Sequence, residues 1–360
     1  MVILSVSVAM VGSVLASTIT AGAQDAAWQE AGAEVRVSGP AITDDLKASL
    51  AAVPGVTAVA GVTEAEVRMS VTDSQGARRD ATVYVVDDAL AQVQAGTPLA
   101  DTLPASLFDD ETGLKIVSGA ELDPAAGALT LGPRGDAEVV GHIDDLPGIT
   151  TDQRFVVVAR SAWEEAGGGS AQGRLALLSV AADSDPNLVA NAVAQAVPNS
   201  LVETPQGKLD AFLAAPATDG LRMLLLAGVV LTTLLTAVAI ALIQALRGPS
   251  QSRLLAILRT LGANAKQLRS LTAWELAPTL VAASFAGVLV GTIVPWLLLQ
   301  TLELTILTGG PQQPELAINP VLLGAVLGSV IATVVISTAL GATASARTSL
   351  AQHLRLGEER

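Results

Sequence analysis

Several kinds of residue that carry chemistry are scarce or missing in this sequence. There is no cysteine, which excludes disulfide bonds and cysteine metal sites. The two histidines, His142 and His353, fall on opposite sides of a membrane under the topology argued below, so a histidine-pair metal site or a supported serine–histidine triad is not expected. The one Gly-Lys pair, Gly207-Lys208, is followed by Leu209, so the chain has no P-loop. We therefore expect no catalysis by this chain and no cofactor or metal bound to it.

Charge is distributed unevenly along the 360 residues. Residues 21–220 hold 11 basic and 29 acidic residues, a net charge of −18, whereas residues 221–360 hold 9 and 5, a net charge of +4, and together these give the overall −14. The apolar fraction is 51% and the mean hydropathy is +0.53, which fits a chain that lies partly in lipid. An acidic block followed by an apolar block with basic loops predicts a soluble domain joined to a membrane domain. The acidity also argues against nucleic acid as a partner.

Long apolar runs predict four membrane-spanning helices, at residues 1–22, 221–246, 270–300 and 320–343. The connection 247–269 carries five Lys or Arg residues and no acid, and the tail 344–360 is also basic near the last span. Basic connections lie on the cytoplasmic side. The sequence therefore predicts that both termini and 247–269 are cytoplasmic, and that 23–203 and the loop 301–319 are extracytoplasmic.

The first apolar run allows two interpretations. Ala21-Gly22-Ala23 resembles the cleavage site of a secretory signal, but no Lys or Arg precedes the run, so we favour a retained span over a cleaved signal. The abrupt start inside an apolar run also suggests that the natural chain begins further upstream.

The segment 23–203 has the pattern of an α+β domain. A strand, a helix and a strand are predicted at 34–37, 43–52 and 56–62, and the same order returns at 174–181, 187–196 and 201–203. Two such βαβ units are what a ferredoxin-like sandwich needs. Strand-type runs between them predict a β-rich subdomain inserted at about 66–160. Residues 204–220 then read as a stalk helix that Pro216 kinks.

The basic connection 247–269 is more than a turn. Leu254, Ile257, Leu258 and Leu261 fall on one stripe of a helix, with Arg259 on the opposite side, so something apolar should cover the stripe. Two further motifs, Gly287-x-x-x-Gly291 and Gly324-x-x-x-Gly328, lie in the third and fourth predicted spans. Small residues four apart let helices pack closely in lipid, either inside one bundle or at a dimer seam.

The segment RLLAILRTLGANAKQLRSLTAWE resembles the signature of FtsX-like (MacB-type) ABC transporter permeases. The order of one span, a large extracytoplasmic domain and three further spans is also similar to that family. Leu254 stands where the family usually has Glu. The residues that match the signature are Arg253, Ile257, Leu258, Arg259, Leu261, Gly262, Ala263 and Gln267.

The resemblance implies a bacterial plasma-membrane permease that works with a second permease chain. Residues 250–261 would form a coupling helix docked on a dimeric ABC ATPase, which would bind ATP and Mg²⁺ in place of this chain. The expected ATPase-coupling residues are Arg253, Leu254, Ile257, Leu258, Arg259, Leu261 and Gly262. ATP hydrolysis would then move the extracytoplasmic domain, by export, extraction or mechanotransmission, with an extracytoplasmic protein as a further possible partner.

Two other functions stay open at the level of sequence. One is a membrane-anchored regulator of a cell-wall hydrolase with the same topology, which an envelope-hydrolase partner would identify. The other is a membrane-bound enzyme or receptor that acts alone, which a polar catalytic cluster would support; we find no such cluster in the sequence.

Overall fold

The computed structural model describes residues 2–65, 68–72, 76, 78–109, 113–122, 128–149, 154–169, 173–216, 219–220, 223–224, 227–232, 234–235, 237–238, 242, 265–301, 313–321, 323–325, 328, 331–332 and 335–336. The chain divides into two compact units. The first, here called the sheet domain, comprises Gly22–Ala214 with Thr308–Gln312. The second, here called the helical unit, comprises Met1–Ala21, Ala215–Leu307 and Gln313–Arg360.

The described part of the sheet domain holds ten strands joined in one sheet. The strands are β1 (Val35–Ser38), β2 (Val56–Glu64), β3 (Met69–Thr72), β4 (Arg78–Val86), β5 (Leu114–Ser118), β6 (Ala128–Leu131), β7 (Asp136–His142), β8 (Phe155–Ala159), β9 (Leu175–Val180) and β10 (Leu201–Glu203). The helices are α2 (Asp44–Ala51), α3 (Leu90–Gln94), α4 (Arg160–Glu165), α5 (Pro186–Ala196) and α6 (Pro205–Ala214), with the short 3-10 helices η1 (Ala105–Phe108) and η3 (Gly132–Arg134).

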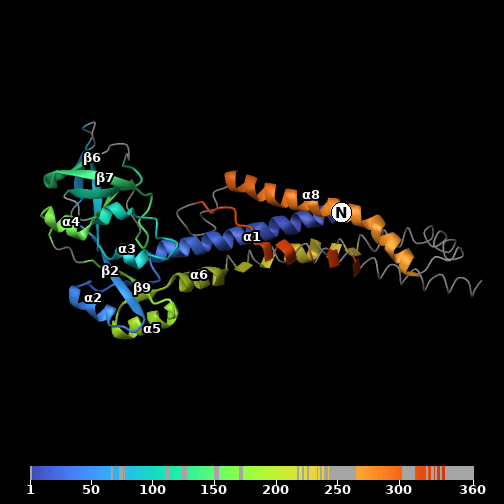
Figure 1. Ribbon diagram of the computed structural model, residues 1–360, viewed down its shortest axis with the longest axis horizontal. Coiled ribbons are helices and arrows are strands. Elements are labelled where there is room, and N and C mark those ends of the chain that lie inside the picture. The colour runs from blue at the N-terminus through green and yellow to red at the C-terminus, as the bar shows by residue number, and fades with distance from the viewer. Residues whose placement is uncertain are drawn as a thin grey trace, which may run out of the picture. The chain divides into compact units, whose positions relative to one another are not determined.

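The first and last parts of the sheet domain form a four-stranded antiparallel layer. The units β1-α2-β2 and β9-α5-β10 interleave in the order β10-β1-β9-β2, which is the strand order of a ferredoxin-like sandwich. Helices α2 and α5 cover one face of this layer, where Leu50 and Val193 are fully buried against Val35 and Leu178. Figure 1 shows α2 and α5 together at one end of the domain.

A side-chain cap begins each of these two helices. Thr43 is the N-cap of α2, and its hydroxyl accepts a hydrogen bond from the Leu46 backbone N–H at 3.2 Å. Asp185 caps α5 by accepting from the Asn187 N–H at 2.8 Å. Gly55 adopts φ +92° in the turn before β2, a conformation that glycine reaches without steric cost.

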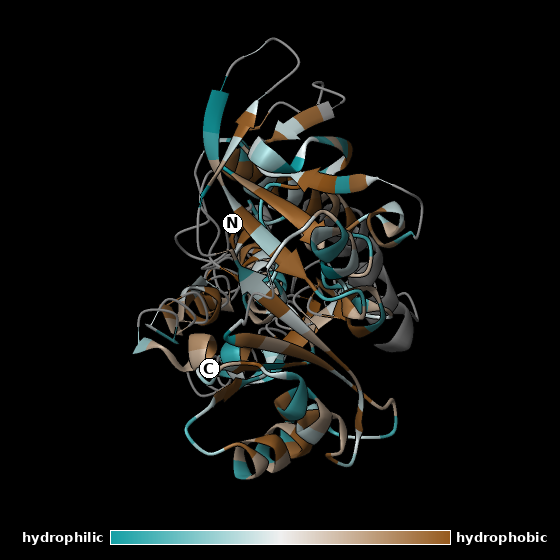
Figure 2. Ribbon diagram, turned by 90° about the vertical axis from the view of Figure 1, so that its left-hand side faces the viewer, coloured by the Kyte–Doolittle hydropathy of each residue, from teal (hydrophilic) through white to brown (hydrophobic). Residues whose placement is uncertain are grey.

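The middle of the chain forms a closed six-stranded barrel. The strands follow the order β4-β3-β6-β7-β5-β8, and a parallel pairing of β8 with β4 closes the ring. Its interior is apolar and contains Val83, Ile116 and Val156, each fully buried. The strands of the domain are largely hydrophobic in Figure 2. Strand β5, at residues 114–118, is an element that the sequence pattern did not predict.

A second apolar cluster joins the barrel to the ferredoxin-like layer. Tyr84 and Phe155 pack edge to face, with ring centroids 5.9 Å apart, against Leu177 of β9 and Val62 of β2. Strand β4 runs through both parts, since its first half pairs with β3 and its end pairs with β2. The inserted strands therefore share both a sheet and a core with the layer from which they branch.

Two long helices dominate the described part of the helical unit: α1 (Val2–Ala31), whose residues to Ala21 belong to it, and α8 (Ala265–Thr301). Among the described residues, one helix, Val6–Ala31, is long and apolar enough to cross a membrane, with a hydropathy of 1.6, and a shorter apolar stretch runs over Phe285–Thr301. The remaining predicted spans, 221–246 and 320–343, are described only in fragments.

One helix boundary differs from the sequence prediction, and the predicted stalk is interrupted beside Pro216. The first helix continues to Ala31 instead of ending near residue 22, because AQDAAWQEA is rich in good helix formers, and it stops where Gly32 adopts φ +77°. Helix α6 ends at Ala214, and the helical pattern is interrupted at Ala215. Pro216 disfavours a helical conformation in the residue before it, so the proline divides the predicted stalk.

Candidate functional site

The predicted coupling segment lies outside the described residues. This applies to Arg253, Leu254, Ile257, Leu258, Arg259, Leu261 and Gly262. Helix α8, Ala265–Thr301, is the first described element after this segment.

The glycines of the third predicted span lie against the first helix. A Cβ added at Gly287 would overlap Val6, and one added at Gly291 would overlap Met10, so only glycine allows this approach of α8 to α1. Val6 and Met10 are fully buried there, with Val288 packed beside them. By contrast, an added Cβ at Gly324 or Gly328 meets no described atom within 4 Å.

These contacts set the relative direction of α1 and α8. Contacts advance by four residues on both helices, from Val6 with Gly287 to Met10 with Gly291, so the two helices run parallel (Figure 1). The segment after α8 returns to α1 near the end of its helical-unit part. The Ser17 hydroxyl donates to the Ala317 carbonyl at 2.5 Å, and the Ala317 N–H donates to Thr18 Oγ1 at 3.2 Å.

In the sheet domain, one lysine bonds the end of α1 to the start of α6. Lys208 Nζ lies 2.6 Å from Glu30 Oε1 and 2.8 Å from Glu203 Oε1, and Glu203 in turn accepts from Arg36 Nη1 at 2.6 Å. We call these four residues the stalk junction. It joins α1, β1, β10 and α6. Helix α1 is the segment by which the chain enters the sheet domain at Gly22, and α6 is the segment by which it leaves at Ala214.

Burial and charge act in opposite directions at the stalk junction. Burial alone would raise the pKa of Glu203, but hydrogen bonds from Lys208 and Arg36 outweigh it and hold that pKa below its ordinary value. Burial would likewise lower the pKa of Lys208, and the bonds to Glu203 and Glu30 instead raise it. Glu203 and Lys208 are therefore both charged near neutral pH, and the ion pair between them persists there.

The turn after α1 is held by backbone contacts that leave no room for a side chain. A Cβ on Gly32 would lie 2.7 Å from the Gly148 Cα atom, and the Gly148 N–H donates to the Gln29 carbonyl at 2.7 Å. The buried Gln94 side chain donates to the Gly32 carbonyl at 3.3 Å. Helix α1 thus ends in a fixed geometry against the domain.

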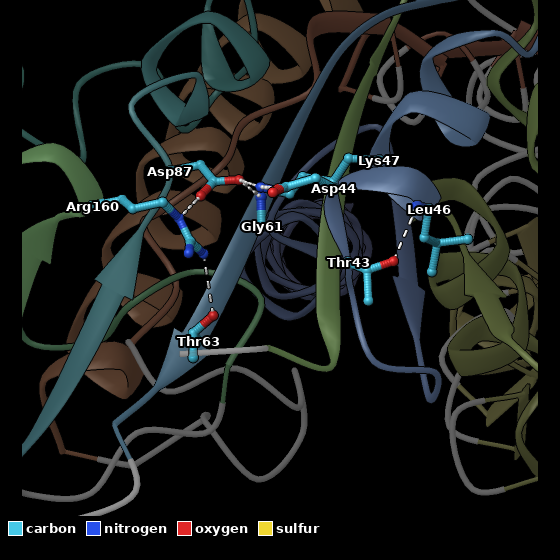
Figure 3. Close-up of polar contacts among 8 residues, drawn as sticks. All are labelled: Thr43, Asp44, Leu46, Lys47, Gly61, Thr63, Asp87 and Arg160. Atoms are coloured by element: carbon cyan, nitrogen blue, oxygen red, sulfur yellow. Dashed lines mark hydrogen bonds and ion pairs between the residues drawn. The ribbon is translucent and has the colours of Figure 1, made fainter. Parts of the chain in front are cut away.

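A second polar cluster joins the ferredoxin-like layer to the barrel (Figure 3). The Asp87 carboxylate, after β4, accepts from the Gly61 N–H of β2 at 2.7 Å and from Lys47 Nζ of α2 at 2.9 Å, and it also pairs with Arg160 at the start of α4. Arg160 donates further to Thr63 at 3.5 Å. We call this group the Asp87 cluster.

The Asp87 cluster is buried and depends on a glycine. The Asp87 side chain is 9% exposed, and a Cβ on Gly61 would lie only 3.0 Å from its Oδ2 atom. Burial alone would raise the pKa of Asp87, but Lys47, the Gly61 N–H and the Arg160 charge together hold it below its ordinary value. A carboxylate bonded to one residue on each of three elements fixes those elements relative to one another.

Other polar groups do not assemble into a catalytic or metal site in the part of the chain that the structure describes. No group of three or more histidine, aspartate or glutamate side chains there could hold a metal ion. His142 Nδ1 lies 3.0 Å from the Ser118 hydroxyl, on neighbouring strands β7 and β5. The polar groups therefore serve to join elements.

An apolar helix that continues into a folded α+β domain, with a further apolar helical stretch at Phe285–Thr301 among the described residues after that domain, is the arrangement of a membrane protein with a large inserted domain. Residues 226–350 match the family model described as FtsX-like permease C-terminal. This part of the chain is therefore similar to the C-terminal domain of FtsX-like permeases, a family of ABC-transporter proteins whose members are typically non-catalytic transmembrane subunits. No curated protein sequence matches the chain significantly.

Two solved structures resemble the chain weakly. The periplasmic region of MacB from Actinobacillus actinomycetemcomitans is 10% identical with a TM-score of 0.36, and the match covers 52% of this chain and 95% of that one. The extracellular domain of the noncanonic ABC-type transporter YknZ from Gram-positive bacteria is 12% identical with a TM-score of 0.32, covering 47% and 99%.

Sequence reasoning did not find the residues of the two polar clusters. In the sequence, Lys208 stands out only as part of the Gly207-Lys208 pair. Asp87 and Arg160 are 73 residues apart, so their ion pair cannot be predicted from their spacing. No local spacing marks such pairs, because the sheet pairing brings them together. The one local signal for the Asp87 cluster is that Asp87, a charged residue, directly follows a predicted strand.

Proposed function

We propose that the chain is the permease subunit of a bacterial ABC transporter of the FtsX/MacB type, with four spans and the sheet domain outside the plasma membrane. A separate dimeric ATPase binds ATP and Mg²⁺ and moves the coupling helix at 250–261. A second permease chain completes the complex. The movement passes along the spans to the sheet domain, where it drives export, extraction or mechanotransmission.

The helix directions in the helical unit support this topology. Helices α1 and α8 run parallel, as the first and third of four alternating spans must. Ala317, in the predicted outer loop, bonds to Ser17 and Thr18, close to the point where α1 enters the sheet domain at Gly22. A Cβ added at Gly12 would lie 3.6 Å from a Val229 side-chain carbon, in ordinary contact distance, so the second predicted span also passes close to α1 in this unit.

The stalk junction is the observation that carries the proposal. A permease of this kind needs a connection through which helix movement reaches the outer domain. Helix α1 is continuous from the helical unit into the sheet domain, and Lys208 bonds its end to α6. A displacement of either helix must therefore act on β1 and β10 through Arg36 and Glu203.

The Asp87 cluster extends the same argument to the barrel. A movement applied to the ferredoxin-like layer is lost if the barrel turns freely on it. Asp87 joins β2 and α2 of the layer to α4 of the barrel, and the shared core of Tyr84 and Phe155 adds apolar contact. The sheet domain therefore moves as one body in the proposed cycle.

The topology and the division of labour can be tested in the cysteine-free chain. Single cysteines replace exposed Ala48 of α2 and Ser252 of the basic connection, and intact cells are treated with an impermeant maleimide. We expect Ala48→Cys to be labelled and Ser252→Cys to be labelled only after lysis. Purified chain alone should have no ATPase activity, since it lacks a P-loop.

The opposite labelling pattern contradicts the topology. Robust ATP turnover by the isolated chain contradicts the permease assignment, provided that a control preparation from cells lacking the chain shows none. The natural ATPase to test as partner is a P-loop protein encoded in the neighbouring reading frame.

A further inference from the structure

Strand β10 has a partner strand on one side only. The barrel closes on itself through the β4–β8 pairing, and the layer continues β2-β9-β1-β10, where it stops. Among the described strands, every other one has neighbours on both sides. Leu201–Glu203 is therefore the strand of the described sheet whose whole length offers a backbone edge to another strand.

Exposed apolar side chains occur at the same end of the layer. Within the described residues of Gly22–Ala214, the exposed large hydrophobic side chains are Leu188 on α5, 68% exposed, and Leu201 on β10, 59% exposed. Helix α5 lies beside β10, since the Thr204 hydroxyl bonds to Asn187 Oδ1 at 2.8 Å. Val189 and Val193 of α5 face the core, so Leu188 is not needed to hold the helix in place.

The segment that forms α5 and the first two residues of β10 also lacks charge. Residues 186–202, PNLVANAVAQAVPNSLV, contain no charged residue, although residues 21–220 carry 40 charged residues and a net charge of −18. We call this surface the neutral face. Depletion of charge at an exposed patch is typical of the centre of protein interfaces.

We propose that the neutral face binds a second copy of this chain, with the two β10 strands pairing antiparallel across a two-fold axis. Two domains of charge −18 repel one another over most of their surface, so identical copies can meet most easily at a patch whose one carboxylate, Glu203, is already paired with Arg36 and Lys208. An antiparallel edge is self-complementary, as a two-fold interface requires. A charged partner of another kind would gain nothing from a patch without charge.

The pairing has a defined centre. Val202 is the middle residue of the three-residue strand, and an axis through it gives the longest pairing. Leu201 of one copy then lies opposite Glu203 of the other. The interface is small, so confinement of both copies in one membrane must supply the effective concentration that it needs. The inference deepens the proposed function, on which it rests for the second permease chain.

Cross-linking of the full chain in membranes tests this interface. Val202→Cys is expressed with two different tags, oxidised, and the dimer is captured through one tag and detected through the other. We expect a disulfide-linked dimer from Val202→Cys and none from Ala48→Cys on α2. In the Val202→Cys background, Leu201→Asp should lower the dimer yield about tenfold, because it repels Glu203 of the other copy twice in a symmetric pair.

Leu201→Lys is the matched control for that substitution. It removes the same leucine but places a positive charge opposite Glu203 of the other copy, so the yield should stay within about twofold of the Val202→Cys parent. If Val202→Cys alters the unfolding midpoint, Leu201→Cys with a short bismaleimide replaces it. Equal loss with Asp and Lys, or no loss with either, overturns the proposed pairing.

Two further outcomes overturn the inference. One is the absence of a Val202→Cys dimer while the ATPase still co-purifies, which leaves the permease function intact. The other is an adduct that contains a different protein instead of the second tag. A Val202→Cys dimer without a bound ATPase would instead support the interface and count against the proposed function.

Discussion

The Nζ atom of Lys208 on α6 lies 2.6 Å from Glu30 Oε1, in the last turn of α1. The same nitrogen lies 2.8 Å from Glu203, so one side chain holds two helices and an edge strand. The Lys208 side chain is 13% exposed, whereas that of Glu30 is 67% exposed. This difference predicts that Lys208 contributes more than Glu30 to the stability of the sheet domain.

Replacing Lys208 should destabilise the sheet domain more than replacing Glu30. Lys208→Ala leaves the partly buried Glu203 without one of its two cationic partners, which should cost about 1–3 kcal/mol. Glu30→Ala removes an exposed pair worth about 1 kcal/mol or less. Denaturant unfolding of the full chain in detergent, with hydrogen exchange of Pro205–Ala214 amides, measures both effects. Equal effects of the two substitutions would contradict the assigned role of Lys208.

Removal of the Asp87 carboxylate should be among the most damaging single changes in the domain. Asp87→Ala leaves Lys47 and Arg160 without their shared partner in a buried site, and breaking a buried pair typically costs about 3–5 kcal/mol. The neighbouring Asp88 is exposed and accepts from the Ser161 hydroxyl, so Asp88→Ala is the matched control, with a loss of about 1 kcal/mol or less. Thermal unfolding of both variants tests the difference.

The two lowered carboxylate pKa values predict acid sensitivity. Asp87 and Glu203 have pKa values below the ordinary 3.8 and 4.5, so their contribution to stability is complete above those values and is lost as the pH falls further. The raised Lys208 pKa contributes fully below the ordinary 10.5 and is lost as the pH rises beyond it. The unfolding free energy should therefore decline below about pH 4.5, and Asp87→Asn should decline less steeply. A slope unchanged in Asp87→Asn would show that Asp87 does not contribute to the acid response.

Helix packing in the helical unit gives a paired prediction. Gly287→Leu should separate α8 from α1, because the glycine faces Val6 with no space for a side chain. Gly324→Leu should have a much smaller effect on the stability of a single chain, since no described atom lies within 4 Å of the added Cβ. Unfolding midpoints in detergent compare the two. A larger drop in the unfolding midpoint for Gly324→Leu than for Gly287→Leu would contradict this prediction. If a dimer also dissociated, the fourth predicted span would form a dimer contact.

Much of the α+β layer could be predicted from local signals. Thr43 and Asp185 are N-cap residues that mark helix starts, and strand β10 has the predicted bounds of 201–203. Strand β5 escaped prediction because Lys115 interrupts the apolar run of LKIVS, although that lysine is buried in the fold. Closure of the barrel depends on β4 meeting β8, about 70 residues later, which no local pattern encodes.

The candidate site shows the same limit. The end of the apolar run predicts where α1 leaves the bilayer but not where the helix ends, since helix propensity continues to Ala31 after apolarity has stopped. The stalk junction depends on that continuation, because Glu30 lies within it. Gly287 and Gly291 could be singled out by their spacing, while their partner helix could not.

The coupling helix is where the central claim, that a separate ATPase drives this chain, is most directly tested. Leu254, Leu258 and Leu261 have the spacing of anchors for a helix in a groove. Burying one leucine contributes about 1.5–3 kcal/mol, and Leu258→Asp would also bury an unpaired charge. Arg259→Ala, on the opposite side of the predicted helix, should matter little.

The decisive measurement is the amount of P-loop ATPase that co-purifies with wild type, Leu258→Asp and Arg259→Ala from membranes containing equal amounts of each chain. The account predicts retention by wild type and Arg259→Ala and at least a tenfold loss for Leu258→Asp, as about 1.4 kcal/mol or more would give. If the helix merely lies on the inner leaflet, Leu258→Asp loosens it from lipid without changing ATPase recovery. Equal retention by wild type and Leu258→Asp would contradict the coupling assignment.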